Sequence, residues 1–257
     1  MDDERPIGII AAVEGEVRYL KKKVLAVEEG RIERTAFIRG RYKEKELVVG
    51  EAGVGISRAS SFALEMVQRF SPKILISTGS CGAVKEDLSK GDIIIADEII
   101  LKRNGIAHFE DGEKEVFYPD RELKEKVYAA LKGSSFPVYQ GNILSTDRFI
   151  YQKNTKEKIR TIFDVIAVEM ESGGVAKVAK KLNLPFIAVR IVSDVFSESL
   201  VRYNKLVDGN GKLNWRKAAP YFFSKPWESF WAIRFHHDLY RIYKKLWEVQ
   251  EKMLEVI

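Results

Sequence analysis

One stretch of the chain, residues 166–194, constrains the fold more than any other part of the sequence. It opens with an apolar run, passes through Glu169 and Glu171 into a helical pattern, and ends in a second apolar run closed by Ser193 and Asp194. This order predicts a strand, a helix and a second strand. The acids then follow the carboxyl ends of two strands, which is where open α/β sheets bind their ligands.

The same alternation of short apolar runs and helical patterns extends through the rest of the chain. Strands are predicted at residues 7–13, 73–78, 91–96 and 138–144, together with a hairpin over residues 31–49. Helices are predicted from apolar spacing at residues 17–24, 59–70, 123–131 and 155–162, the third capped by Asp120. Residues 100–118 are irregular and charged, and they are predicted to form a surface excursion. Strands that alternate with helices indicate an α/β fold with a mostly parallel sheet.

The sequence changes character after Asp194. Residues 201–257 are predicted to form a C-terminal aromatic helical extension of an α/β domain that spans residues 1–200. From Pro226 onward, large apolar and aromatic residues recur at helical spacing, which predicts one or two amphipathic helices. This apolar stripe is expected to pack on the same domain or on a dimer partner, rather than to bind a cofactor.

Composition argues against several classes of protein. The 257-residue chain has a net charge of +6, much of it between Lys205 and Lys252. Acidic residues interleave with these basic ones, so a solvated face is favoured over a nucleic-acid or membrane surface. The chain lacks an apolar stretch of about 18 residues, and its acidic start is unlike a signal peptide. A single cysteine, Cys81, is compatible with a reducing compartment, and three histidines offer no metal-ligand spacing.

A glycine-rich segment follows the strand predicted at residues 73–78. It reads Gly79-Ser80-Cys81-Gly82. Such a segment can present backbone N–H groups and a hydroxyl to an anion. It matches neither a phosphate-binding P-loop nor a dinucleotide-binding pattern, so the motif alone does not identify a ligand.

Six motifs, taken together, resemble the nucleoside phosphorylase/nucleosidase superfamily. They are IGIIAAVEGEV from Ile7, GVGISRA from Gly53, ISTGSCGAV from Ile76, KGDIIIADE from Lys90, LSTDRFI from Leu144, and IAVEMES from Ile166 with VRIVSD from Val189. Over residues 7–196 the similarity is closest to the 5′-methylthioadenosine/S-adenosylhomocysteine nucleosidases. The resemblance implies a three-layer α/β/α fold with a twisted mixed central sheet.

The resemblance also implies an active site. Cleavage of an N-ribosidic bond places positive charge on the ribose and negative charge on the departing purine. Asp194 matches the family's general acid at purine N7, and it would need a raised pKa to donate a proton near neutral pH. Ser193 would steady this acid. Glu16 matches the glutamate that activates water, and Arg190 matches a residue that holds this water and the nearby acid.

Other residues match the family's substrate contacts. Glu171 corresponds to the carboxylate that accepts hydrogen bonds from both ribose hydroxyls, and Met170 would pack against the sugar. Phe149 would stack on the base, Ile150 would offer it backbone groups, and Glu169 matches another position near the base. Gly79 and Ser80 would line the nucleophile's pocket.

Three of these assignments have simpler readings. Glu16 and Glu171 could each be an acid that matches the positive end of a helix dipole. Asp194 could be a turn or helix cap after its strand. The combination of all six motifs favours the catalytic readings over these structural ones.

A hydrolase uses water as the nucleophile, whereas a phosphorylase uses phosphate. Phosphorolysis needs cations or backbone donors for the phosphate. Hexameric purine nucleoside phosphorylases resemble this chain at GSCGAV but carry an arginine where Ser77 stands, and another in the first glycine-rich loop, where this chain has Glu14 and Glu16. Carboxylates there repel phosphate and suit water, so the sequence predicts a hydrolase that releases adenine and needs no cofactor.

The long tail leaves other functions open. Its LVDGNGKLN segment and aromatic helix resemble the longer hopanoid-associated branch, which is thought to act on adenosyl-hopane. A purine nucleoside phosphorylase acting on a bulky apolar 5′-adenosyl compound is therefore an alternative, and a non-catalytic nucleoside-binding protein is a second. The resemblance also implies a homodimer, and a cytoplasmic location is expected.

Overall fold

The computed structural model describes residues 4–103, 114–150, 152–197 and 226–257, with side chains of the last segment described from residue 237. The first half of the chain contains β1 (Ile7–Ala11), α1 (Glu14–Lys21), β2 (Leu25–Ile32), β3 (Thr35–Tyr42), β4 (Lys45–Glu51), α2 (Ile56–Phe70) and β5 (Ile74–Ala83). The second half contains β6 (Ile93–Lys102), β7 (Lys114–Phe117), α3 (Arg121–Lys132), β8 (Val138–Thr146), α4 (Lys153–Ile162), β9 (Ala167–Glu169), α5 (Ser172–Lys181), β10 (Phe186–Asp194) and α7 (Pro226–Val256).

The strands form one mixed sheet that partly closes on itself. β1 pairs in parallel with β4 and β5, and β3 and β2 continue the sheet in antiparallel pairs beyond β4. On its other side β5 pairs in parallel with β10, and the pairings then run through β6, β8 and β9 back to the end of β5. The predicted mixed sheet is confirmed. The expectation of a mostly parallel sheet is wrong, because β2–β3, β3–β4, β5–β9, β6–β7 and β6–β10 are antiparallel.

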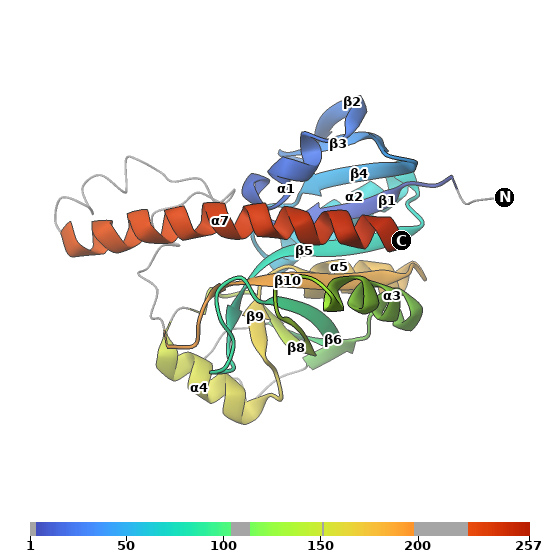
Figure 1. The fold of residues 1–257 in the computed structure, drawn as a ribbon. Helices are drawn as coiled ribbons and strands as arrows, with labels where there is room; N and C mark the ends of the chain where they lie inside the picture. Colours follow the sequence, from blue (N-terminus) through green and yellow to red (C-terminus); the bar gives the residue numbers. More distant parts are fainter. Residues whose placement is uncertain (1–3, 104–113, 151, 198–225) are drawn as a thin grey trace.

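Helices cover both faces of the sheet and confirm the three-layer architecture. α2 and α5 bury their apolar faces in one core cluster, through side chains such as Phe62, Met66 and Val175. α1, α3 and α7 bury theirs in a second cluster on the other face, where Leu20 and Val127 contribute. Figure 1 shows α7 crossing this second face, with α5 behind the sheet.

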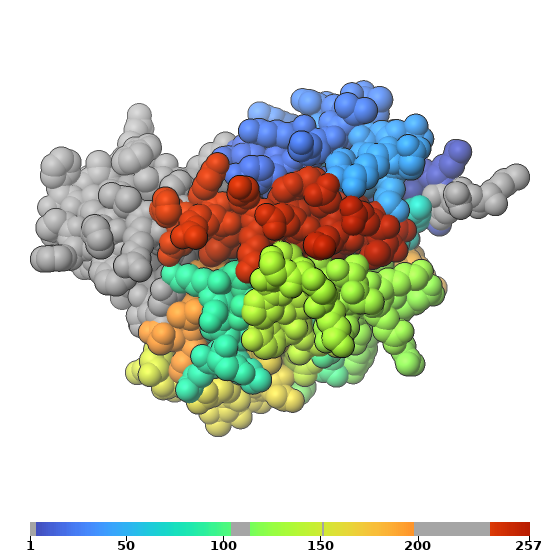
Figure 2. All heavy atoms as spheres, in the orientation of Figure 1, coloured from blue at the N-terminus to red at the C-terminus, as the bar shows by residue number. Residues whose placement is uncertain are grey.

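The C-terminal helix α7 is part of the core. Its apolar stripe includes Ile242, Leu246, Val249 and Met253, and all four are buried in the cluster that α1 and α3 share. In Figure 2, its described residues lie between the N-terminal elements, in blue, and α3, in yellow-green. The stripe therefore packs on its own chain along this part of the helix. The LVDGNGKLN segment and the predicted domain boundary after residue 200 lie outside the described residues.

Three local predictions differ from the structure. β5 continues through the glycine-rich segment to Ala83, because β9 and β10 both pair with that part of the strand. The N-terminal hairpin gains a further strand, β2, at the edge of the sheet, where Leu25 and Val27 are exposed. The irregular region expected at residues 100–118 contains the end of β6 and all of β7, which pair with each other.

The cap at Asp120 is confirmed by its hydrogen bond from Leu123 N, at 2.9 Å.

Candidate active site

Four buried carboxylates and two buried cations gather around the glycine-rich end of β5. Glu16 contacts it from the start of α1, while β9 and β10 approach it from its other side. In the strand register Arg190 lies opposite Gly79 and Asp194 opposite Gly82. The three-residue spacing between those glycines corresponds to ~10 Å along a strand, roughly the length of a nucleoside. The acids predicted from separate motifs therefore meet at one segment of one strand.

Glu16 is held by donors from two segments. Its Oε2 accepts hydrogen bonds from Ala12 N at 2.9 Å and Val13 N at 3.3 Å, and its Oε1 accepts from the backbone N and Oγ of Ser80, both at 2.8 Å. Gly79 has a φ of +149°, and a Cβ there would lie 2.9 Å from this carboxylate. The anion that the glycine-rich segment receives is thus the protein's own Glu16. Of the four donors only the Ser80 hydroxyl can rotate, so it is the one that can yield to a water molecule.

The α7 helix supports the same residue from behind. Gln250 is buried, and its Nε2 donates to the backbone O of Glu16 at 2.8 Å and lies 3.4 Å from Thr78 Oγ1. Sequence reasoning missed this residue, because it belongs to a stripe that reads as ordinary helix packing. The contact ties the C-terminal helix to the first turn of α1.

Arg190 and Glu169 form a buried ion pair. Arg190 is 1% exposed, and its Nε and Nη2 lie 3.2 and 2.7 Å from Glu169 Oε2. Burial raises the pKa of Glu169, but Arg190 and the N–H of Ser172 outweigh it, and the net effect is to lower the pKa. Arg190 Nη2 also donates to Ser77 Oγ at 2.7 Å. Among the described residues, Arg190 Nη1 has no hydrogen-bond partner.

Glu171 has a very different environment from Glu169. It is 8% exposed, and its Oε1 accepts a hydrogen bond from Gly55 N, at the start of α2, at 2.9 Å. Its side chain makes no capping hydrogen bond to α5, although Glu171 occupies the N-cap position. Burial, together with the charges of Glu169 and Glu16, raises the pKa of Glu171 to about 8. A role as a simple helix cap is therefore not supported by the geometry.

The contact between Glu171 and α2 depends on a close approach of two helices. A Cβ at Gly174 would overlap the backbone carbonyl O of Ile56 and lie 3.0 Å from Ser60 N. Gly174→Ala is expected to reduce the free energy of unfolding by roughly 1–3 kcal/mol through overpacking, whereas alanine in an ordinary helix stabilises by about 1 kcal/mol. Chemical denaturation measures the change. A more stable variant would contradict the close packing of α2 on α5.

Asp194 is paired with a cation that sequence reasoning missed. Its Oδ2 lies 2.6 Å from Lys156 Nζ, and Lys156 also donates to the carbonyl O of Val195 at 2.9 Å. Ser193 Oγ lies 3.1 Å from both Asp194 Oδ1 and the Cys81 carbonyl O, which supports the predicted steadying role of Ser193. The sequence spacing could have indicated that Lys156 is buried, because it precedes the buried Ile159 by one helical turn and therefore lies on the inward face of α4.

The remaining predicted contacts lie beside this cluster. Met170 is half-buried in the turn between β9 and α5. Phe149 is half-buried after β8, and Ile150 is buried in a small core with α4 residues. Gly173 N donates to Ser145 Oγ at 3.0 Å, which joins the end of β8 to the start of α5. The segments that carry the three residues therefore adjoin the charged cluster.

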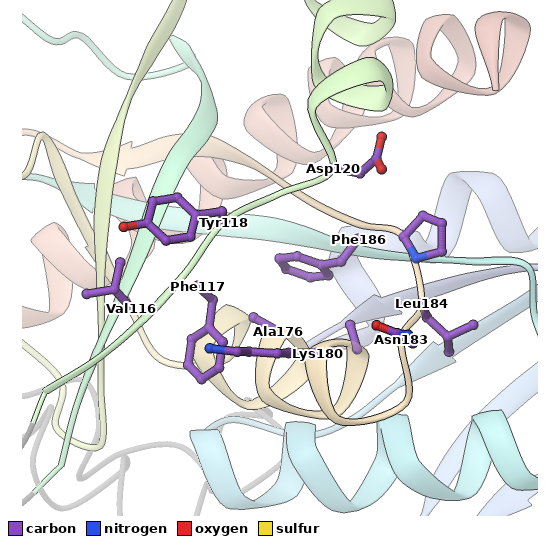
Figure 3. A pocket seen from close by; sticks show the side chains of 11 residues that line it. Val116, Phe117, Tyr118, Asp120, Ala176, Lys180, Asn183, Leu184 and Phe186 are labelled. Carbon is purple, nitrogen blue, oxygen red and sulfur yellow. The ribbon is translucent and has the colours of Figure 1, made fainter.

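A pocket of about 420 Å³ lies away from these groups (Figure 3). Its walls include Phe117, Tyr118, Lys180 and Phe186, and it opens near the amino end of β10 and the carboxyl end of α5. Asp194 of the candidate site lies at the carboxyl end of β10, and Glu171 lies at the amino end of α5. A strand of nine residues spans ~26 Å, so this pocket is separate from the candidate active site.

A partly closed mixed sheet between helical layers places this protein in the α/β class, with a candidate small-molecule site where the buried acids gather at one strand. The chain belongs to the phosphorylase superfamily, whose family model matches residues 6–209. It is 34% identical over 196 residues to a 5′-methylthioadenosine/S-adenosylhomocysteine nucleosidase of Staphylococcus aureus, which covers 74% of this chain and 86% of the relative.

Solved structures show the same fold. The nucleosidase of Neisseria meningitidis, in complex with methylthio-immucillin-A, aligns with a TM-score of 0.77 and 23% identity over 98% of this chain and 100% of its own. A futalosine hydrolase of Helicobacter pylori aligns with a TM-score of 0.77 and 20% identity over 99% of both chains. These likenesses establish the architecture, while the closer sequence relative is named a nucleosidase.

Proposed function

We propose that this protein hydrolyses the N-ribosidic bond of a 5′-substituted adenosine and releases adenine. The observation that carries the proposal is the convergence of Glu16 and Asp194 on one short segment of β5, with Glu171 in electrostatic range of Glu16. A general acid, a base for water and a ribose-binding carboxylate are the groups that this reaction needs. The identity to a relative named as a nucleosidase supports the same activity.

The proposed chemistry divides the work among these residues. The bond between C1′ and N9 breaks, and its electron pair moves to the purine. Asp194 acts as the general acid that protonates N7. Glu16 takes a proton from the water whose oxygen bonds to C1′. Glu171 accepts hydrogen bonds from the two ribose hydroxyls. Arg190 Nη1, which has no hydrogen-bond partner among the described residues, is available to orient the water. Met170, Phe149 and Ile150 are proposed to contact the sugar and the base.

Water is favoured over phosphate because the cations of the cluster are already paired. Arg190 is bonded to Glu169 and Lys156 to Asp194. Glu16 lies beside Gly79 and Ser80, at the place where the nucleophile is proposed to bind. An incoming phosphate dianion would meet this carboxylate at close range, whereas a neutral water would not be repelled.

Adenine release from 5′-methylthioadenosine, measured with and without phosphate, tests the function. Release at equal rates, with free 5-methylthioribose as the other product, is the expected result. Release only with phosphate, with a ribose 1-phosphate as product, would establish the phosphorylase instead. Tight nucleoside or liposome binding with no turnover would identify a non-catalytic protein.

Glu16→Gln tests the base. The amide keeps the shape of the side chain but cannot take a proton from water, so kcat is expected to fall by about 10²–10⁴-fold. Because Glu16 is not proposed to contact the base or the diol, the Kd of a non-hydrolysable adenosine analogue should change little. Calorimetric titration measures Kd and a coupled adenine assay measures kcat. Equal losses of both quantities would indicate that Glu16 is structural.

Assays of substrates that differ in the 5′-substituent identify the preferred one. Methylthioadenosine, S-adenosylhomocysteine, adenosine and an adenosine with a long 5′-alkyl chain span the candidates, because the fold is shared with both a nucleosidase and a futalosine hydrolase. A homodimer and a cytoplasmic location remain predictions of the family resemblance. In the described part of the chain, no helix is both long and apolar enough to cross a bilayer.

A further inference from the structure

We propose that Lys156 is the proton reserve of the general acid, so that the Lys156–Asp194 pair, rather than Asp194 alone, supplies the proton to the departing purine. The inference rests on the proposed hydrolysis. It concerns a residue that neither the motifs nor the resemblance assigned. Lys156 acts through Asp194 and is therefore a positioning and proton-holding residue, not one that touches the substrate.

The geometry carries the inference. Lys156 is 0% exposed, and its Nζ lies 2.6 Å from Asp194 Oδ2 and 2.9 Å from the Val195 carbonyl O. A lysine is almost never fully buried unless it is paired. Asp194 ends β10 and Val195 follows it directly, so the ammonium from α4 is directed at the one carboxylate that the reaction needs as an acid.

A close ammonium favours the charged form of a carboxylate. An ionised Asp194 has no proton of its own to donate, and yet the departing purine requires one. Lys156 Nζ carries a proton that is already hydrogen-bonded to Asp194 Oδ2. The ammonium can pass this proton to Asp194 across the hydrogen bond, and the carboxylic acid so formed gives a proton to N7.

The proton balance closes without another reactant. In each turnover Lys156 loses one proton, Asp194 passes one proton to purine N7, and Glu16 gains one proton from water. The C1′–N9 electron pair leaves with the purine, and a new C1′–O bond forms from water. Proton exchange with solvent then recharges Lys156 and discharges Glu16, so no oxidant, reductant or second substrate is needed.

The competing explanation is a buried ion pair that only joins α4 to β10. Such a pair would lower activity through loss of structure, equally at every pH and for every leaving group. If Lys156 is a proton reserve, the loss of activity on its removal should depend on the pH and on the leaving group. An ammonium holds its proton to a higher pH than a carboxylic acid does, so the reserve extends activity toward alkaline pH.

Lys156→Met is the principal test, since methionine is apolar and of similar length. The kcat for 5′-methylthioadenosine at pH 8 is expected to fall about 10²-fold, and the alkaline limb of its pH profile to move down by at least about one pH unit. With a 4-nitrophenyl riboside, whose leaving group departs as a stable anion, kcat should stay nearly unchanged. An equal, pH-independent loss on both substrates would overturn the proposal.

Two further variants keep the test clean. Lys158, an exposed residue of the same helix, provides the matched control, and Lys158→Met should behave as wild type. Lys156→Gln can hydrogen-bond the same two oxygens without carrying a charge, and it replaces the methionine variant if that protein fails to fold. The glutamine variant should show the same alkaline shift, and an unshifted profile would again reject the proton reserve.

Infrared spectroscopy separates this proposal from the proposed function. At neutral pH the wild type should lack a carboxylic acid C=O band from Asp194, whereas Lys156→Met should show one that disappears in the Lys156→Met, Asp194→Asn double variant. A band already present in the wild type and removed by Asp194→Asn would overturn the inference even if adenine is released. Correct infrared behaviour without adenine release would instead reject the hydrolysis.

Discussion

Asp194→Asn is expected to lower kcat for adenine release by about 10²–10⁴-fold, the range that general acid catalysis supplies. The asparagine amide has nearly the same shape, but it has no acidic proton for N7 and cannot relay one from Lys156. The loss should appear in kcat with natural nucleosides and be much smaller with a 4-nitrophenyl riboside. Stopped assays of free adenine and of nitrophenolate measure the two rates.

A control is needed because the substitution also removes the partner of a buried cation. Lys156 Nζ lies 2.6 Å from Asp194 Oδ2 in a fully buried position, and breaking such a pair destabilises proteins by about 3–5 kcal/mol. The Asp194→Asn, Lys156→Met double variant removes both charges and should recover much of the stability without recovering activity. Near-normal adenine release by Asp194→Asn would refute the assignment of the acid.

Glu171→Gln is expected to stabilise the fold at alkaline pH while weakening nucleoside binding. The folded-state pKa of about 8 lies above the ordinary value of 4.5, so the folded protein binds the proton more tightly than the unfolded chain does. The stability that this proton provides is complete below pH 4.5 and is lost as the pH rises through 8. The slope reaches at most about 1.4 kcal/mol per pH unit.

The glutamine variant lacks this titration. Its free energy of unfolding, measured by denaturant at pH 5, 7 and 9, should therefore exceed that of the wild type increasingly as the pH rises. The difference between the unfolding free energies of the wild type and the variant reports on Glu171 alone, because the other groups that titrate over the same range are present in both proteins. A difference that does not change with pH would show that Glu171 is ionised throughout this range.

Glu171 also makes nucleoside binding depend on pH. A carboxylate that accepts hydrogen bonds from both ribose hydroxyls must be ionised, so binding below pH 8 should expel a proton from Glu171. Titration calorimetry at pH 7 in buffers of different ionisation enthalpy counts the released protons. Release close to one proton is expected for the wild type. For Glu171→Gln, affinity should fall by about 1.5–3 kcal/mol, the range for hydrogen bonds to a charged group.

Much of the fold could be predicted from local patterns. The helical spacing of Phe62 and Met66 marks the inward face of α2, and the apolar runs mark the buried strands, because core positions repeat with the period of each element. The order of the pairings could not be predicted in this way. β5 extends to Ala83 because β9 and β10 supply partners for its backbone, and those partners lie far away in the sequence.

Some residues of the candidate site could likewise be predicted from local patterns, and others could not. Glu16, Glu171 and Asp194 could be proposed from motifs, because an acid directly after an apolar run stands out locally. Lys156 and Gln250 could not, since each stands in a helix where charged or polar residues are ordinary. Only their burial, 0% and 3% exposed, and their contacts with Asp194 and Glu16 distinguish them.

Sequence alone determined most of the helices and strands and which acids follow the strands, because the spacing of apolar residues and the position of charge are local properties of the chain. Tertiary structure decided the state of each acid. Glu169 and Glu171 stand two residues apart in one motif, yet Arg190 and backbone N–H groups lower the pKa of the first, despite burial, while burial and neighbouring charge raise the pKa of the second. Proton affinity depends on what surrounds a carboxylate in space, and those neighbours come from β10, α2 and α1.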